Sequence, residues 1–124
     1  MMRSWFYGLA VAILLSLATT PVLAASVEGE LVDSRCYLTM GAKGSDHQMC
    51  AQTCAKSGLP LGVLTGKGKY YTLVVQPQPL AEYAGEQVRV EGKLDKKSST
   101  ITPEKLEVSK DGSWQAVELP KQMM

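Results

Sequence analysis

Three cysteines and the only histidine of this 124-residue chain lie within one short stretch. In chain order they are Cys36, His47, Cys50 and Cys54. Thiolate sulfur and imidazole nitrogen are ligands that Zn²⁺ and Cu(I) prefer in proteins, and three cysteines with one histidine form a familiar tetrahedral set. The residue types therefore predict one metal ion, Zn²⁺ or Cu(I), held by these four side chains in a structural or metal-handling role.

A disulfide is the alternative use of the same thiols. Cys36 can bridge to Cys50 or Cys54, and closing a loop of about 15 residues in this way is worth roughly 3 kcal/mol. A bridge between Cys50 and Cys54 is less favourable, because side chains one helical turn apart suit disulfide geometry poorly. Three cysteines cannot all pair within one chain. In this interpretation the protein is a disulfide-stapled binding module without a metal.

Thiol-based redox chemistry is the third interpretation. A helix N-terminus and a nearby histidine both favour the thiolate form, and His47 and Cys50 lie in the first turn of an expected helix. However, three residues separate Cys50 from Cys54, whereas the common redox motif is C-x-x-C, and the C-x-x-C-H motif for haem attachment is absent. No catalytic or cofactor-binding residue is assigned, and a non-enzymatic protein is favoured over an enzyme.

The elements that position these side chains follow from local signals. Ser45 is expected to be the N-cap of a short helix, with Gln48 as its capping-box partner, and Gly58 is expected to end that helix. The histidine and the last two cysteines then fall on one helical face, at i, i+3 and i+7. Residues 37–44 are expected to form a glycine-punctuated loop, which lets the first cysteine fold back toward the helix.

The remainder of the chain has the alternating pattern of half-buried strands separated by turn residues. A helical turn is expected at 80–85, and Asp111-Gly112 predicts a two-residue hairpin turn. Strands are predicted at 26–36, 59–65, 69–75, 87–94 and 100–108, with one additional strand at 114–119. This order predicts a mainly β protein: a five-stranded OB-like Greek-key barrel with the Cys/His-bearing helix inserted between its first two strands.

The N-terminus has the pattern of a secretory signal peptide. Arg3 precedes an apolar run at 5–17, and small residues before Ala25 suit cleavage. We therefore predict a signal peptide at 1–24 and a single OB-like domain at 25–124, with residues 37–58 as the metal- or disulfide-bearing insertion. The protein is expected to be exported, to the periplasm or as a secreted protein, with no membrane association beyond the signal peptide.

Charge restricts the class of partner. Twelve acidic residues and 13 basic ones are present, and removing Arg3 with the signal peptide leaves 13 − 1 = 12 basic residues and no net side-chain charge. A nucleic-acid-binding domain of this size is ordinarily basic, with lysine and arginine gathered on one face. Nucleic acid is therefore not an expected partner. A protein of the cell envelope is the expected one.

Beyond these physical signals, the chain resembles a group of small exported bacterial OB-like proteins. Their shared pattern is a cysteine after the first strand, a helix resembling H-x-x-C-A-x-x-x-C or H-x-x-C-A-x-x-C, and then G-x-P-x-G. The matching residues here are Cys36, His47-x-x-Cys50-Ala51-x-x-Cys54 and Gly58-Leu-Pro60-Leu-Gly62. The resemblance implies a shared site role for the four candidate ligands. It implies no particular activity, and an accessory role in an envelope redox complex is the working expectation.

Overall fold

Strand β1 (Ala25–Asp33) lies at the centre of the sheet. It pairs antiparallel with β2 (Leu61–Thr65) on one side and with β4 (Gln87–Asp95) on the other. The computed structural model describes residues 25–121. The predicted signal peptide at 1–24 lies outside the described residues, so that assignment and the predicted domain boundary stay predictions. Within the described part, no helix is both long and apolar enough to cross a membrane.

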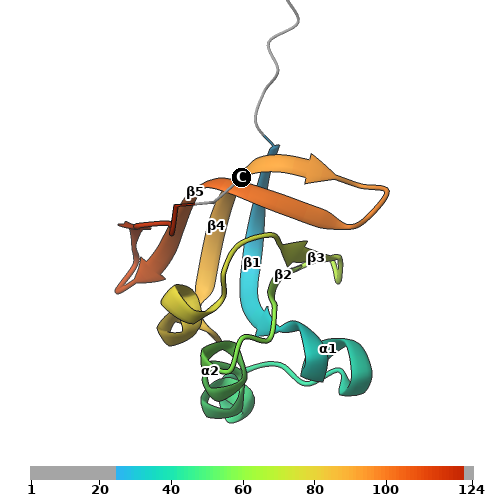
Figure 1. The fold of residues 1–124 in the computed structure, drawn as a ribbon. Helices are drawn as coiled ribbons and strands as arrows, with labels where there is room; N and C mark the ends of the chain where they lie inside the picture. Colours follow the sequence, from blue (N-terminus) through green and yellow to red (C-terminus); the bar gives the residue numbers. More distant parts are fainter. Residues whose placement is uncertain (1–24, 122–124) are drawn as a thin grey trace, which may run out of the picture.

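The strands close into a barrel. Strand β3 (Tyr70–Leu73) pairs with β2, and the long β5 (Thr100–Lys110) pairs with β4. Closure comes from a parallel pairing of β3 with the beginning of β5. Strand β6 (Ser113–Val117) is bonded to the far end of β5, outside the barrel (Figure 1). The predicted five-stranded OB-like barrel with an extra C-terminal strand is confirmed.

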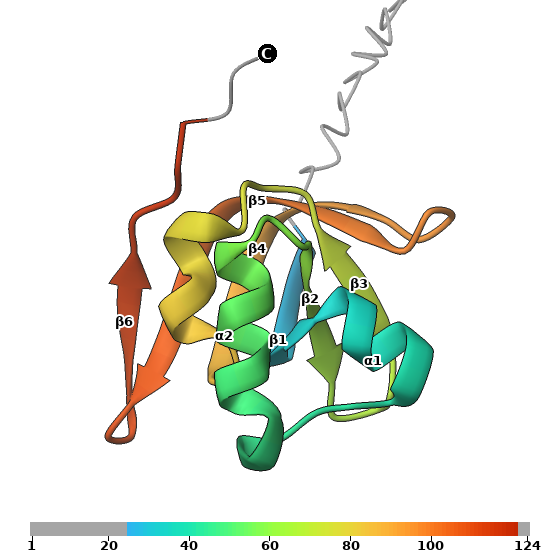
Figure 2. The same ribbon diagram turned by 60° about the horizontal axis from the view of Figure 1, so that its bottom comes forward.

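The helical segments gather at one end of this barrel (Figures 1 and 2). Three of them lie between β1 and β2: α1 (Ser34–Met40), the 3-10 turn η1 (Ser45–His47) and α2 (Gln48–Lys56). A further 3-10 turn, η2 (Gln78–Tyr83), lies between β3 and β4 and packs beside α2 (Figure 2). The insertion that bears the cysteines and the histidine is therefore two α-helices and a 3-10 turn, and it covers the barrel end.

Branched aliphatic side chains from every barrel strand form one core. The helix α2 contributes only Ala51 and Ala55 to it, which are 3% and 0% exposed. Small side chains let a helix approach a barrel closely, because no long side chain separates them. The fully buried strand residues include Leu31, Leu61, Val63, Val88, Val90, Ile101, Leu106 and Val108.

The segment after β1 differs from the sequence-based expectation. The predicted strand over 26–36 ends at Asp33, and the first half of the predicted loop at 37–44 belongs to helix α1. The Asp33 carboxylate accepts hydrogen bonds from the backbone N–H groups of Arg35 (3.2 Å) and Cys36 (3.3 Å), which makes it the helix N-cap. Gly41, at φ 66°, ends the helix in a left-handed conformation. Cys36 is consequently a helical residue.

The predicted capping box at Ser45 and Gln48 is also wrong. Gly44 is the N-cap of η1, and neither η1 nor α2 has a side-chain cap. The Gln48 side chain donates instead to the Glu86 carboxylate, 3.3 Å away. A tertiary partner has replaced the local one. The predicted end of the helix is confirmed, since α2 ends at Lys56 and Gly58 follows at φ 94°.

Two glycines allow neighbouring strands to cross closely. A Cβ on Gly29 would lie 2.0 Å from the Leu64 carbonyl oxygen, and a Cβ on Gly92 would lie 2.0 Å from the Thr102 carbonyl oxygen. The ladder between β4 and β5 shifts register at Gly92, which pairs with Pro103. Proline within a sheet is ordinarily found at an edge or a bulge, and Pro103 lies at this irregularity. A side chain at either place would displace backbone atoms of the neighbouring strand.

We expect Gly29→Ala to lower the free energy of unfolding by about 1–3 kcal/mol, because the new methyl group must displace backbone atoms of β2. The matched control is Gly66→Ala, at a position where a Cβ meets no atom within 4 Å. That control should change stability by less than about 0.5 kcal/mol. Urea unfolding followed by circular dichroism measures both. Equal stabilities of the two variants would contradict the close approach at Gly29.

Candidate metal centre

Cys36 is held in place by the helix cap at Asp33 and by the contacts of Ser34. On its N-terminal side, Asp33 caps the helix that contains it, and the Ser34 N–H donates to the Pro60 carbonyl at 3.0 Å. The Ser34 hydroxyl also hydrogen-bonds to the Tyr70 hydroxyl, which links α1 to strand β3. The Cys36 residue is only 8% exposed. Its thiol is thus held at the junction between β1 and the helical end of the barrel.

The other candidate ligands are held by contacts of α2 and the loop before it. The Gly44 N–H donates to the Glu30 carboxylate at 3.0 Å, which ties the loop back to β1. The Gln52 side chain donates to the Glu82 carbonyl at 3.2 Å, and Ala51 is buried against the barrel. These contacts fix both the position and the rotation of α2. His47 lies in η1, immediately before the helix, rather than within it.

The structure brings the candidate ligands together in two overlapping groups. A ring nitrogen of His47 and the Sγ atoms of Cys36 and Cys50 all lie within 4.8 Å of one another. The Sγ atoms of Cys36 and Cys54 also lie within 4.8 Å of each other and of an Asp33 carboxylate oxygen. Cys36 belongs to both groups, and all three cysteines are free thiols. Cys36 thus lies near each of the other three candidate ligands, in two groups that do not merge into one four-ligand set.

These separations suit a metal ion with small adjustments. Zn–S bonds of about 2.3 Å place two sulfur ligands of a tetrahedral ion about 3.8 Å apart, and three ligands in a plane about 4.0 Å apart. Ligand atoms that lie within 4.8 Å of one another reach these separations when side-chain rotations bring them closer by about 1 Å or less. Cys36, His47 and Cys50 form the group whose sulfur and nitrogen atoms suit Zn²⁺ or Cu(I). Cys54 lies beside this group, next to Asp33.

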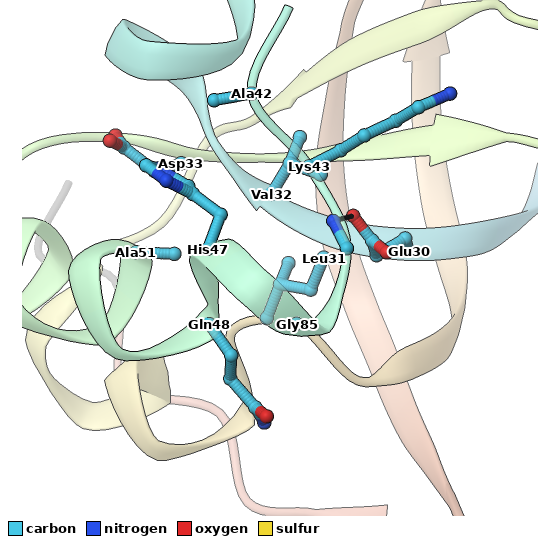
Figure 3. A pocket seen from close by; sticks show the side chains of 11 residues that line it. Glu30, Leu31, Val32, Asp33, Ala42, Lys43, His47, Gln48, Ala51 and Gly85 are labelled. Atoms are coloured by element: carbon cyan, nitrogen blue, oxygen red, sulfur yellow. Dashed lines mark hydrogen bonds between the residues drawn. The ribbon is translucent and has the colours of Figure 1, made fainter.

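An unsatisfied nitrogen marks the same place. The His47 Nε2 atom is buried and has no hydrogen-bond partner among the described residues. Buried polar atoms ordinarily have a partner, because leaving one without costs about 1–3 kcal/mol. Figure 3 shows the His47 ring extending from the start of the helical segment toward the end of β1, where Asp33 lies. A metal ion bound by this ring would give the Nε2 atom a partner, either by direct coordination or by reorienting the ring.

A narrow crevice runs between β1 and the segment that leads into α2 (Figure 3). His47 and Asp33 lie at one end of this crevice, and Glu30 lies at the other with Lys43 beside it. The imidazole ring of His47 thus lies beside this crevice. The two cysteines of the first group do not line it, so it is an approach to the imidazole rather than to the thiols.

The Asp33 carboxylate contributes to a raised pKa of two of the thiols, Cys36 and Cys54. Its hydrogen bond to the Cys36 thiol, followed by burial, raises the pKa of Cys36 from 9.0 to about 12. Burial and then the same carboxylate raise the pKa of Cys54. Since protonated Cys36 is favoured in the folded state, it stabilises the metal-free protein below pH 9.0. That stabilisation is lost as the pH rises from 9.0 toward about 12.

Sequence reasoning missed Asp33 as a member of this site. The signal was present in Asp33-Ser-Arg-Cys36, where an N-cap residue type precedes the cysteine by three positions. The valine and leucine residues before it predicted a continuing strand and concealed the helix start. Asp33 is 1% exposed, so its charge acts on the neighbouring thiols with little screening by solvent.

Comparisons with known proteins identify no relative: no family model, curated protein or solved structure matches this chain. The resemblance drawn from the cysteine and histidine pattern is supported only at the level of a five-stranded β-barrel fold. The function of the site must therefore be argued from its own geometry.

We expect Asp33→Asn to lower the pKa of Cys36 from about 12 toward 9.0, because the carboxylate is the first cause of the shift. Asparagine is as good an N-cap as aspartate, so α1 should persist. The measurement is a pH titration of thiolate ultraviolet absorbance in a background where Cys50 and Cys54 are serine. Asp46→Asn, at an exposed position, is the control. A Cys36 pKa that stays near 12 in Asp33→Asn would assign the shift to burial alone.

Proposed function

We propose that this protein binds one Zn²⁺ or Cu(I) ion between α1 and α2, with Cys36, His47 and Cys50 as ligands and Cys54 as the fourth. The observation that carries the proposal is the buried, unpartnered Nε2 of His47. That ring also has a nitrogen within 4.8 Å of two thiols. A histidine with a purely packing role would ordinarily have a hydrogen-bond partner for each buried ring nitrogen.

The choice between the two ions depends on Cys54. Three ligands, two sulfur and one nitrogen, satisfy the low coordination number of Cu(I), whereas a structural zinc site requires four. The Cys54 Sγ lies within 4.8 Å of the Cys36 Sγ, so Cys54 is the thiol available as a fourth ligand. The three-ligand arrangement favours Cu(I), and movement of Cys54 into the group favours Zn²⁺.

The ion would act as a clip. Cys36 lies on α1, whereas His47 and Cys50 lie on η1 and α2, so one ion joins two segments separated by the loop at 41–44. These segments contribute few side chains to the core, since only Ala51 and Ala55 of α2 belong to it. Metal binding adds its free energy to folding where a small domain has a modest core. An exposed Cys50 also keeps the ion within reach of a partner.

The wider role follows the same proposal. A small exported protein with a soft-metal site suits metal handling in the cell envelope, as an accessory of a redox complex. Support for export comes from the N-terminal sequence pattern. The expected partner is a protein, because the acidic and basic residues balance outside the predicted signal peptide. No catalytic step is part of this proposal.

We expect the reduced protein to bind one Zn²⁺ ion per chain, and His47→Ala to weaken that binding by more than about 100-fold. Losing a second-shell partner alone costs about 10- to 100-fold in affinity, and a direct ligand contributes more. Competition with a chromophoric chelator measures both affinities, and a parallel titration with Cu(I) ranks the two ions. Apparent affinity should rise with pH, because the ion replaces the proton that Cys36 retains.

The control is Met49→Leu, which removes an 81% exposed thioether beside Cys50 and leaves the proposed ligands intact. Its affinity for Zn²⁺ should match that of the unaltered protein. Binding that survives His47→Ala unchanged would contradict the proposed site. Failure of the reduced protein to retain any ion would contradict the proposed function as a whole.

A further inference from the structure

The Cys36 thiol has more than one possible partner. Its Sγ lies within 4.8 Å of the Cys50 Sγ in the first group and within 4.8 Å of the Cys54 Sγ in the second. One sulfur atom forms one disulfide bond, so these three thiols can make a single bridge at a time. Cys50 and Cys54 lie one turn apart on α2, where a direct bridge between them is geometrically unfavourable. Any bridge therefore includes Cys36.

Exposure gives the three thiols different access to solvent. Cys50 is exposed, Cys54 is intermediate, and Cys36 is buried. A disulfide-bearing molecule from outside reaches Cys50 first, since thiol–disulfide exchange requires direct contact between sulfur atoms. A buried thiol within a short distance of an exposed one is the arrangement that resolves a mixed disulfide inside the same chain. Cys36 has that position relative to Cys50.

We propose that the cluster is a site of thiol–disulfide exchange, at which an external disulfide reacts with exposed Cys50 and buried Cys36 resolves the mixed disulfide. One consequence of this inference rests on the proposed function. Because the ion and the disulfide use the same two sulfur atoms, the metal-bound form and the form bridged between Cys36 and Cys50 exclude each other. The substrate class is a small-molecule or protein disulfide that can approach the beginning of α2.

The exchange proceeds in two displacements. The Cys50 thiolate attacks one sulfur of the external disulfide, forming a mixed disulfide and releasing the first external thiolate. The Cys36 thiol then passes its proton to the Asp33 carboxylate, to which it is hydrogen-bonded, and its sulfur attacks the Cys50 sulfur. This step forms the internal bridge and releases the second external thiolate. The Cys50 and Cys36 sulfur atoms lose two electrons in total, and the external disulfide gains them as two thiolates. The proton from Cys36 ends on one of these released thiolates. An ion bound beforehand loses both sulfur ligands of the first group and keeps only His47 there.

Cys54 is not required for either displacement. The group that contains Cys54 and Cys36 does not include Cys50, whereas Cys36 and Cys50 share a group with His47. After the bridge forms, Cys54 is the remaining thiol, next to Asp33. This assignment accounts for an odd number of cysteines: two form the exchangeable pair, and the third completes the metal site in the reduced form.

The experiment uses the purified protein loaded with Zn²⁺ and treated with oxidised glutathione as the external disulfide. Zn²⁺ release is followed with a chromophoric chelator, and disulfides are mapped by mass spectrometry of peptides after alkylation. The expected result is one ion released for each bridge between Cys36 and Cys50. Zn²⁺ retained in the presence of excess oxidised glutathione, or a bridge that joins Cys36 to Cys54 from the start, would overturn the inference.

Two variants are compared in the reduced, metal-free state, where loss of ion binding does not obscure the exchange. Cys54→Ser should form the same internal bridge as the unaltered protein. Cys36→Ser should stop after the first displacement and accumulate glutathione on Cys50. Absence of that trapped adduct, while circular dichroism shows Cys36→Ser folded, would overturn the order of steps. If Cys36→Ser does not fold, the map of the unaltered protein decides between the two bridges.

The proposed function and this inference fail in different ways. Absence of Zn²⁺ binding is detected before any disulfide is added, and it would overturn the proposed function and the coupling together. Zn²⁺ binding without formation of the Cys36–Cys50 bridge would overturn only the exchange. Release of the ion in step with that bridge would support both.

Discussion

The candidate site depends on the carboxylate of Asp33. This side chain lies at the end of the central strand β1, is nearly inaccessible to solvent, and accepts two backbone N–H groups of α1. It thereby starts the helix that points Cys36 inward, and it reaches the thiols of Cys36 and Cys54. One buried charge thus performs a structural task and an electrostatic one, because a capping carboxylate necessarily lies beside the first turn of its helix.

The barrel is the frame against which the two helices are oriented. Close crossing at Gly29 shapes the central strand, and the alanines of α2 bring its cysteine-bearing side near the end of that strand. Polar contacts from α2 and its preceding loop reach Glu30 and the segment around Glu86. The site lies where these restraints converge. Its geometry is consequently a property of the fold, although every candidate soft ligand comes from one short stretch of chain.

The cluster combines two opposing tendencies. Protonation of Cys36 is favoured when no ion is present, whereas an ion requires thiolate ligands. The exposed thiol of Cys50 connects the same group to solvent. A soft ion, an external disulfide and a proton would therefore compete for overlapping sulfur atoms. This competition is the physical link between the metal-binding role and the exchange chemistry that we propose.

Sequence alone determined the barrel, the helical character around the last two cysteines, and the four soft side chains, because alternation, turn residues and ligand types are local properties. It did not determine where β1 ends, because the residues before Asp33 suit a strand. Asp33 starts a helix only when its carboxylate accepts hydrogen bonds from the backbone N–H groups that follow it. Nor did it reveal that Gln48 pairs with Glu86, or that Cys54 lies with Asp33 rather than in the first group. Those outcomes depend on segments far apart in the chain, and only the closed barrel brings them into contact.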